Sequence, residues 1–245
     1  MKKRSIAYLI DIAEQIRETS ALETKQIAFI PRVMATASLP VSKQQDNEFI
    51  RRNGNRTLTM LASREIGLPY GATPRLALCA ITTLSKQNQS NIISLGPSTA
   101  HFLNIMGKSC TGLWQPNSPY RWQSQLILTD EFYQHTQQYA IPIDLRVLHA
   151  CGHYPLAMDI YCWLTYRYYS LKRPITISWG DLMIQFGNRY QRDSHFKANF
   201  RNALDRVALF YPQARFVVDQ YGIQLLPSPT HVPPRDLNHY LRSSE

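Results

Sequence analysis

The chain has 245 residues, of which 44% are hydrophobic and 18% charged, and its formal net charge is +10 at pH 7. This length and composition describe a folded globular protein of one or two domains. No run approaches the roughly 18 apolar residues of a membrane span, and Met1 is followed by charges that do not fit a signal peptide. We therefore expect a cytoplasmic protein that is not attached to a membrane.

The excess of lysine and arginine is shared by both halves of the chain. Residues 1–140 carry 15 basic and 9 acidic side chains, and residues 141–245 carry 12 and 8. Such a balance favours a polyanionic partner, either nucleic acid or an acidic membrane surface. It is also common among ordinary soluble proteins, so charge alone does not decide the function.

The first 48 residues predict an amphipathic helix followed by an irregular arm. Residues 4–19 have helical spacing of apolar side chains, and residues 31–47 are rich in Pro, Ser, Ala and Gln. The helix could dock on the body of the protein or mediate self-association, and the sequence leaves both open.

Residues 49–140 follow the element order of a winged-helix domain. Asn53-Gly54 predicts a hairpin, a helix begins at Thr73-Pro74, and residues 91–95 resemble a strand. Two more helices are expected to begin at Gly96-Pro97 and at Ser118. The last of them is expected to present three polar side chains to DNA: Arg121, Gln123 and Gln125.

Residues 141–232 repeat this order more completely. The pattern predicts a helix over residues 154–171, a strand over 175–177 and a helix over 179–186, closed by a left-handed Gly187. A further helix should begin at the N-cap Ser194 and end before Pro212. Two strands, 215–219 and 223–226, then form a hairpin that would be the wing.

The helix after Ser194 divides into an apolar stripe and a polar outer face, as a DNA recognition helix requires. We expect Lys197, Arg201 and Asn202 to face the major groove, Arg189 and Arg192 to contact phosphates, and Arg215 to contact the backbone beside the wing. His195 and Asn199 share the outer face. A solvated surface helix with no ligand is the alternative. The expected fold is α+β, mainly helical, with tandem winged-helix domains joined near residues 137–142 and a tail at 233–245.

Catalytic and metal-binding patterns are weak. Gly107-Lys108-Ser109 ends like a phosphate-binding loop, but Phe102 stands where the first glycine is needed. His149, Cys151 and His153 do not make a closed zinc site, and the four cysteines (Cys79, Cys110, Cys151 and Cys162) are widely spaced. No acid/base pair of carboxylates and no histidine pair beside a nicking tyrosine is visible. We expect no metal, no cofactor and no enzymatic activity.

Several stretches, taken in order over residues 49–232, resemble plasmid-encoded replication proteins of the RepA C-terminal family. They are Phe49 to Gly54, Thr57 to Met60, Gly67 to Gly71, Pro74-Arg75, Pro155 to Arg167, Ser178-Trp179, Gln185 to Gly187, Tyr211 to Ala214 and Pro227 to Pro229. The resemblance implies tandem winged helices and a replication initiator that binds repeated double-stranded sites at an origin and helps to open the duplex. It also implies recruitment of host replication proteins, such as a helicase or an initiator, and leaves a homodimer open.

The leading hypothesis is therefore sequence-specific binding of origin DNA without catalysis. The alternative is a winged-helix transcriptional regulator or repressor, because a fold does not fix a function. A relaxase or nuclease forms a third class, which any protein-dependent nicking of supercoiled DNA would favour.

Overall fold

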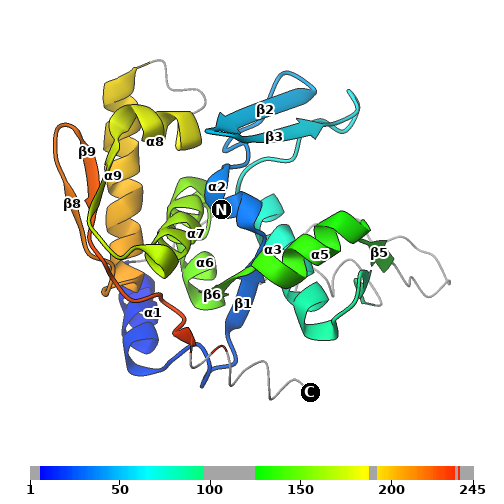
Figure 1. The fold of residues 1–245 in the computed structure, drawn as a ribbon, viewed down its shortest axis with the longest axis horizontal. Helices are drawn as coiled ribbons and strands as arrows, with labels where there is room; N and C mark the ends of the chain where they lie inside the picture. Colours follow the sequence, from blue (N-terminus) through cyan, green and yellow to red (C-terminus); the bar gives the residue numbers. More distant parts are fainter. Residues whose placement is uncertain (1–5, 97–124, 188–191, 235–236, 238–245) are drawn as a thin grey trace.

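The computed structural model describes residues 6–96, 125–187, 192–234 and 237. Helices dominate this part of the chain, and its strands form four small sheets in which every pairing is antiparallel (Figure 1). The protein is thus mixed α and β and mainly helical, as expected. None of the described helices is long and apolar enough to cross a membrane.

The first half of the chain alternates short helices with paired strands. The expected N-terminal helix is present and docks on the body, where it packs against α6 and α9. The expected hairpin at Asn53-Gly54 is also present. The described elements before residue 140 are α1 (Ile6–Glu18), β1 (Ile27–Ile30), α2 (Arg32–Thr36), β2 (Glu48–Asn53), β3 (Arg56–Leu61), α3 (Ala72–Asn88), β4 (Ile92–Ser94), β5 (Gln125–Ile127) and α5 (Asp130–Tyr139).

From residue 155 on, the second half follows the order expected from caps and periodicity, whereas the strand and helix over residues 141–151 were not expected. Pro155 occupies the first turn of its helix, and the Ser178 hydroxyl accepts a hydrogen bond from the Asp181 amide at 3.1 Å. The elements are β6 (Ile141–Asp144), α6 (Leu145–Cys151), α7 (Pro155–Ser170), β7 (Ile175–Ser178), α8 (Trp179–Phe186), α9 (Asp193–Phe210), β8 (Phe216–Val218) and β9 (Gly222–Leu225). The last three strands form one sheet in the order β7-β9-β8.

The helix α7 is the centre of the hydrophobic core. Its residues from Leu156 to Thr165 are all buried, and α2, α3, α6 and α9 pack around it. A helix that is apolar on every side is expected to be surrounded by protein in this way. One hydrophobic cluster extends from α1 to β9 and so includes residues on both sides of position 140. The expected domain boundaries at residues 48, 140 and 232 stay a prediction.

A buried ion pair joins α3 to α7. The Arg75 guanidinium, which has no exposed surface, donates to both carboxylate oxygens of Asp159, from Nε at 2.7 Å and from Nη2 at 2.6 Å. Its remaining donors reach the main-chain oxygens of Leu39, Pro40 and Gly71. All the hydrogen-bonding positions of the guanidinium are thereby used, and the first half of the chain is tied to the centre of the second.

Three local expectations were wrong. The helix expected from Ser118 does not continue through residues 125–127, which form a strand paired with β4; Gln125 lies opposite Ser94. Residues 31–47 are not irregular throughout, since α2 begins at Arg32 and packs on α7. Gly187 ends α8 with φ −95° and is not left-handed, although a Cβ there would lie 2.8 Å from the Met183 oxygen. The expected helix after Gly96-Pro97 lies outside the described residues.

Candidate nucleic-acid interface

The helix α9 has one buried and one exposed face, as its sequence predicted. It begins at Asp193 with Arg192 at the N-cap, two residues before the N-cap expected at Ser194. An aspartate in the first turn is favourable because the helix N-terminus carries partial positive charge. The buried stripe consists of Phe196, Phe200, Ala203, Leu204, Val207 and Phe210. This stripe fixes which side of the helix is free to meet a ligand.

The exposed face near the start of α9 carries amide and cationic side chains. His195, Asn199, Arg201 and Asn202 are exposed, and Lys197 is half-buried. No carboxylate occurs between residues 194 and 204. The structure therefore brings these five expected site residues onto a single helix, with Arg192 exposed at its start.

Two of these cations cover a tryptophan of α8. The Lys197 ammonium lies 5.9 Å and the Arg201 guanidinium 5.3 Å from the Trp179 ring centroid. Trp179 also contacts the rings of Phe196 and Phe200, with centroids 6.4 and 6.0 Å away. Cation–π contacts at such distances are weakly favourable. They hold both cations close to the surface where α8 and α9 meet.

The turn between β8 and β9 is fastened to the same surface. The Asp219 carbonyl oxygen accepts hydrogen bonds from Trp179 Nε1 at 3.1 Å and from Arg201 Nη2 at 3.2 Å. Its carboxylate accepts from the amides of Tyr221 and Gly222 at 2.7 and 2.9 Å, which closes the turn. The ring of Tyr221 is 71% exposed at the tip. Helix α9 and the hairpin thus present their polar groups side by side.

Gly222 holds the hairpin close to β7. A Cβ at this position would lie 2.0 Å from the Ile177 carbonyl oxygen. No side chain can fit there without separating β9 from β7, so the approach of the two strands requires a glycine.

Arg215 has a different environment from the one expected. It precedes β8 and therefore lies at the base of the hairpin, away from the turn. Its guanidinium donates to the Pro227 oxygen, and its amide donates to the Ser228 hydroxyl at 3.0 Å. In this structure Arg215 joins the hairpin to the C-terminal segment, and a role at the DNA backbone stays a prediction.

The remaining expected site residues are not on this surface or are not described. Arg189, Arg121 and Gln123 lie outside the described residues. Gln125 is exposed on the strand β5 and not on a reading helix, which corrects its expected setting. No group of three or more His, Cys, Asp and Glu side chains is arranged to hold a metal ion within residues 6–96, 125–187 and 192–234.

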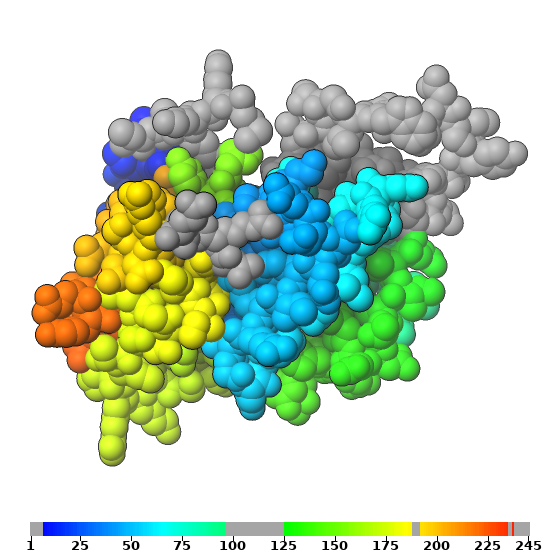
Figure 2. Space-filling model, turned by 90° about the horizontal axis from the view of Figure 1, so that it is seen from above, coloured from blue at the N-terminus to red at the C-terminus, as the bar shows by residue number. Residues whose placement is uncertain are grey.

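The β2–β3 hairpin lies beside α8, which the sequence did not predict. Figure 2 shows the blue segment that includes this hairpin next to the yellow residues of α8 and α9. Arg51, which is 2% exposed, donates from Nη1 to the Gln185 oxygen, and Gln185 donates to the Ala35 oxygen at 3.1 Å. Burial is the main cause that lowers the pKa of Arg51, to about 10. Arg51 therefore stays cationic at neutral pH. The sequence predicts the turn of this hairpin from Asn53-Gly54, but it contains no local pattern that predicts the packing of the hairpin against α8.

The fold and this surface define a mixed α/β protein in which a basic helix and a β-hairpin form one exposed, polar face. A family model described as plasmid encoded RepA protein matches residues 113–181. The match confirms the resemblance to the RepA family over these residues, which are less than a third of the chain; the resembling stretches at 49–75 and 185–229 lie outside it. It includes β5, α5, β6, α6, α7 and β7 and ends within α8, before α9. No curated protein and no solved structure matches the chain.

Proposed function

We propose that this protein is a plasmid replication initiator that binds double-stranded origin DNA sequence-specifically and without catalysis. The observation that carries the proposal is the outer face of α9, where His195, Asn199, Arg201 and Asn202 are exposed together. Guanidinium and amide groups are the side-chain groups that hydrogen-bond base edges in the major groove. The similarity to plasmid RepA proteins supports an origin as the target.

The arrangement around α9 supports a winged helix formed by residues 155–226. The element order is helix, strand, helix, helix, strand, strand, and the central strand of the sheet is the last one, β9. In such a unit α8 would be the positioning helix, α9 the recognition helix and the β8–β9 hairpin the wing. The hydrogen bond from Arg201 to Asp219 would fix the wing against the recognition helix. A second reader in residues 49–140 stays a prediction, because its expected reading helix lies mostly outside the described residues.

Arg201→Ala is expected to weaken binding to the cognate duplex by roughly 1–3 kcal/mol, because a guanidinium that reads a base contributes about that much. Fluorescence anisotropy with cognate and scrambled duplexes measures the loss. If Arg201 only neutralises phosphate, both duplexes will lose affinity alike.

Two controls separate base reading from an altered wing. Because Arg201 also donates to Asp219 in the wing, its removal could alter the wing as well as base reading. The first control is therefore Asn199→Ala, which changes an exposed side chain on the same face of α9. Lys172→Ala removes an exposed cation just after α7 and should leave specificity unchanged. Equal affinity of Arg201→Ala and the parent for the cognate site would remove Arg201 from the interface.

The initiator role has its own test. A plasmid that carries the gene and its flanking DNA should be maintained, and the same plasmid with the gene deleted should be lost unless the protein is supplied in trans. Maintenance without the protein, together with specific DNA binding, would instead establish a regulator.

A further inference from the structure

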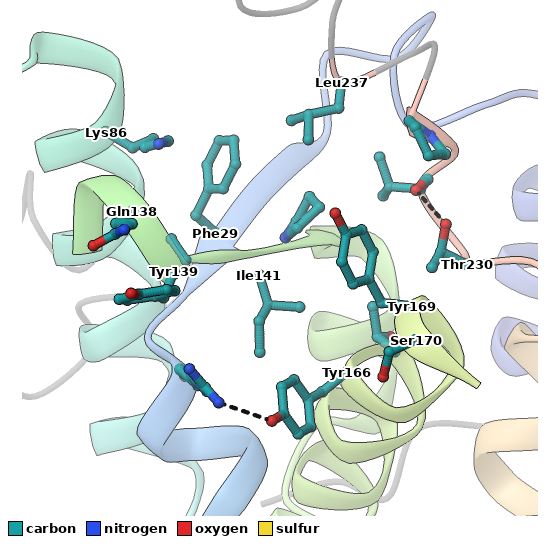
Figure 3. A pocket seen from close by; sticks show the side chains of 16 residues that line it. Phe29, Lys86, Gln138, Tyr139, Ile141, Tyr166, Tyr169, Ser170, Thr230 and Leu237 are labelled. Atoms are coloured by element: carbon teal, nitrogen blue, oxygen red, sulfur yellow. Dashed lines mark hydrogen bonds between the residues drawn. The ribbon is translucent and has the colours of Figure 1, made fainter. Parts of the chain in front are cut away.

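A pocket of about 640 Å³ is lined by residues that do not belong to the proposed DNA-reading face. It lies between α5, the β1–β6 sheet, the end of α7 and the C-terminal segment, whereas α8 and the β2–β3 hairpin lie at the top of Figure 1. Figure 3 shows Tyr139 from α5, Tyr166 and Tyr169 from α7 and Phe29 from β1 around the same space. Four aromatic rings therefore line the pocket among the described residues.

The only charged side chains among the described residues that line the pocket are cationic. They are Arg32 and Lys86, and no described lining residue is Asp or Glu. The Arg32 guanidinium lies 5.4 Å from the ring centroid of Tyr139 and 5.6 Å from that of Tyr166. It donates to the Tyr166 hydroxyl at 3.2 Å, while its buried Nε has no hydrogen-bond partner within the described residues. The guanidinium therefore lies at the pocket wall with one donor that no described residue uses.

The pKa of Tyr166 agrees with positive charge beside the pocket. Burial raises the pKa of Tyr166, whereas the hydrogen bonds from Arg32 and Arg56 and the charges of these two residues lower it. The lowering is the larger effect, so the pKa of Tyr166 is below its usual value. Burial lowers the pKa of Lys86. The Lys86 ammonium also donates to the Gln137 oxygen, which holds it at the pocket.

We propose that this pocket binds a nucleotide unit, with the base stacked on a tyrosine ring and the phosphate beside Arg32 and Lys86. Aromatic side chains stack on any base, and arginine and lysine are the usual phosphate partners. The volume is within the range of small-molecule sites. The same chemistry occurs in a free nucleotide and in a single-stranded nucleic acid, and the experiment separates these two sources.

Tyr169→Ala in the full-length protein tests the stacking surface. Tyr169 is 76% exposed near the end of α7, so its removal leaves the core intact. The probe is a fluorescein-labelled, single-stranded 12-nucleotide DNA of mixed sequence, followed by anisotropy and competed with deoxyadenosine monophosphate. Loss of one stacking partner should weaken oligonucleotide binding roughly 5- to 150-fold, from about 1–3 kcal/mol per base. Tyr70→Ala, at an exposed tyrosine outside the pocket, is the matched control and should bind as the parent does.

Lys86→Gln tests the phosphate side and should reduce the dependence of binding on salt. Displacement of the oligonucleotide by the mononucleotide would support a site for free nucleotides. Resistance to displacement, with loss of binding in Tyr169→Ala, would support a site for a single strand. If Tyr169→Ala and Lys86→Gln both bind the oligonucleotide as the parent does, or if the parent binds neither probe, the pocket is not a nucleotide site.

The two proposed sites can fail separately. Arg201→Ala should weaken duplex binding and leave binding of the oligonucleotide to the pocket unchanged. Tyr169→Ala should weaken binding of the oligonucleotide and leave duplex binding unchanged. An Arg201→Ala protein with normal duplex affinity would count against the duplex-reading face only. An unaffected Tyr169→Ala protein would count against the pocket only.

Discussion

Asp159→Asn is expected to lower the free energy of unfolding by about 3–5 kcal/mol, the usual effect of removing one partner of a buried ion pair. Arg75 would then be a cation with no exposed surface and no counter-ion. The carbonyl oxygens of Leu39, Pro40 and Gly71 would still accept its hydrogen bonds, but they carry no compensating charge. Urea denaturation followed by circular dichroism gives the change.

The matched control is Asp205→Asn, at an exposed aspartate of α9, where a surface substitution should cost less than about 0.5 kcal/mol. Because the ion pair joins α3 to α7, the loss should appear with probes in both halves of the chain. A stability of Asp159→Asn within about 0.5 kcal/mol of the parent would show that the pair does not hold the halves together.

Acidification from pH 7 to pH 4 is expected to destabilise the protein through His231. Burial is the main cause that lowers the pKa of His231, to about 4, and Arg146 adds to this effect while Asp144 opposes it. The neutral ring fits its site: His231 Nδ1 lies 2.8 Å from the Tyr161 hydroxyl, which itself accepts a hydrogen bond from the Asp144 amide. The Tyr161 proton is therefore available to His231, and a protonated imidazole would place two donors against each other.

The direction of the pH effect follows from the lowered pKa. Between the unfolded pKa of about 6.5 and the folded pKa of about 4, the unfolded chain binds more protons. Stability is therefore complete above the unfolded value and is lost as the pH falls, by up to roughly 3 kcal/mol.

His231→Gln removes this titration. The difference in unfolding free energy between parent and variant should shrink from pH 7.5 to pH 4.5. Parallel curves for His231→Gln would contradict the buried, neutral imidazole.

The second half of the chain was predictable because its signals are local. Ser178 caps a helix, Pro155 begins one, and the apolar residues of α9 keep a helical period, so each element could be placed within a few residues. The outer face of α9 follows directly from that period. The contacts that hold it could not be predicted, since the approach of Asp219 to Arg201 depends on how the hairpin folds back.

The N-terminal arm was harder to predict because its partners are distant in sequence. Ile27 pairs with Asp144, and Arg51 reaches Gln185, more than 100 residues away. Neither residue carries a local pattern that names its partner. The short strand at Gln125 was mistaken for helix because nearby apolar residues also fit a helical spacing. In the structure Gln125 pairs with Ser94 of β4, a contact that the sequence does not indicate.

Binding to the DNA that flanks the gene tests the central claim most directly. Anisotropy would compare the flanking segment with a scrambled duplex at two salt concentrations, because non-specific phosphate binding falls steeply with salt. We expect tight binding to the flanking segment that survives the salt concentration at which the scrambled duplex is released. Equal and equally salt-sensitive binding to both duplexes would contradict sequence-specific recognition by α9.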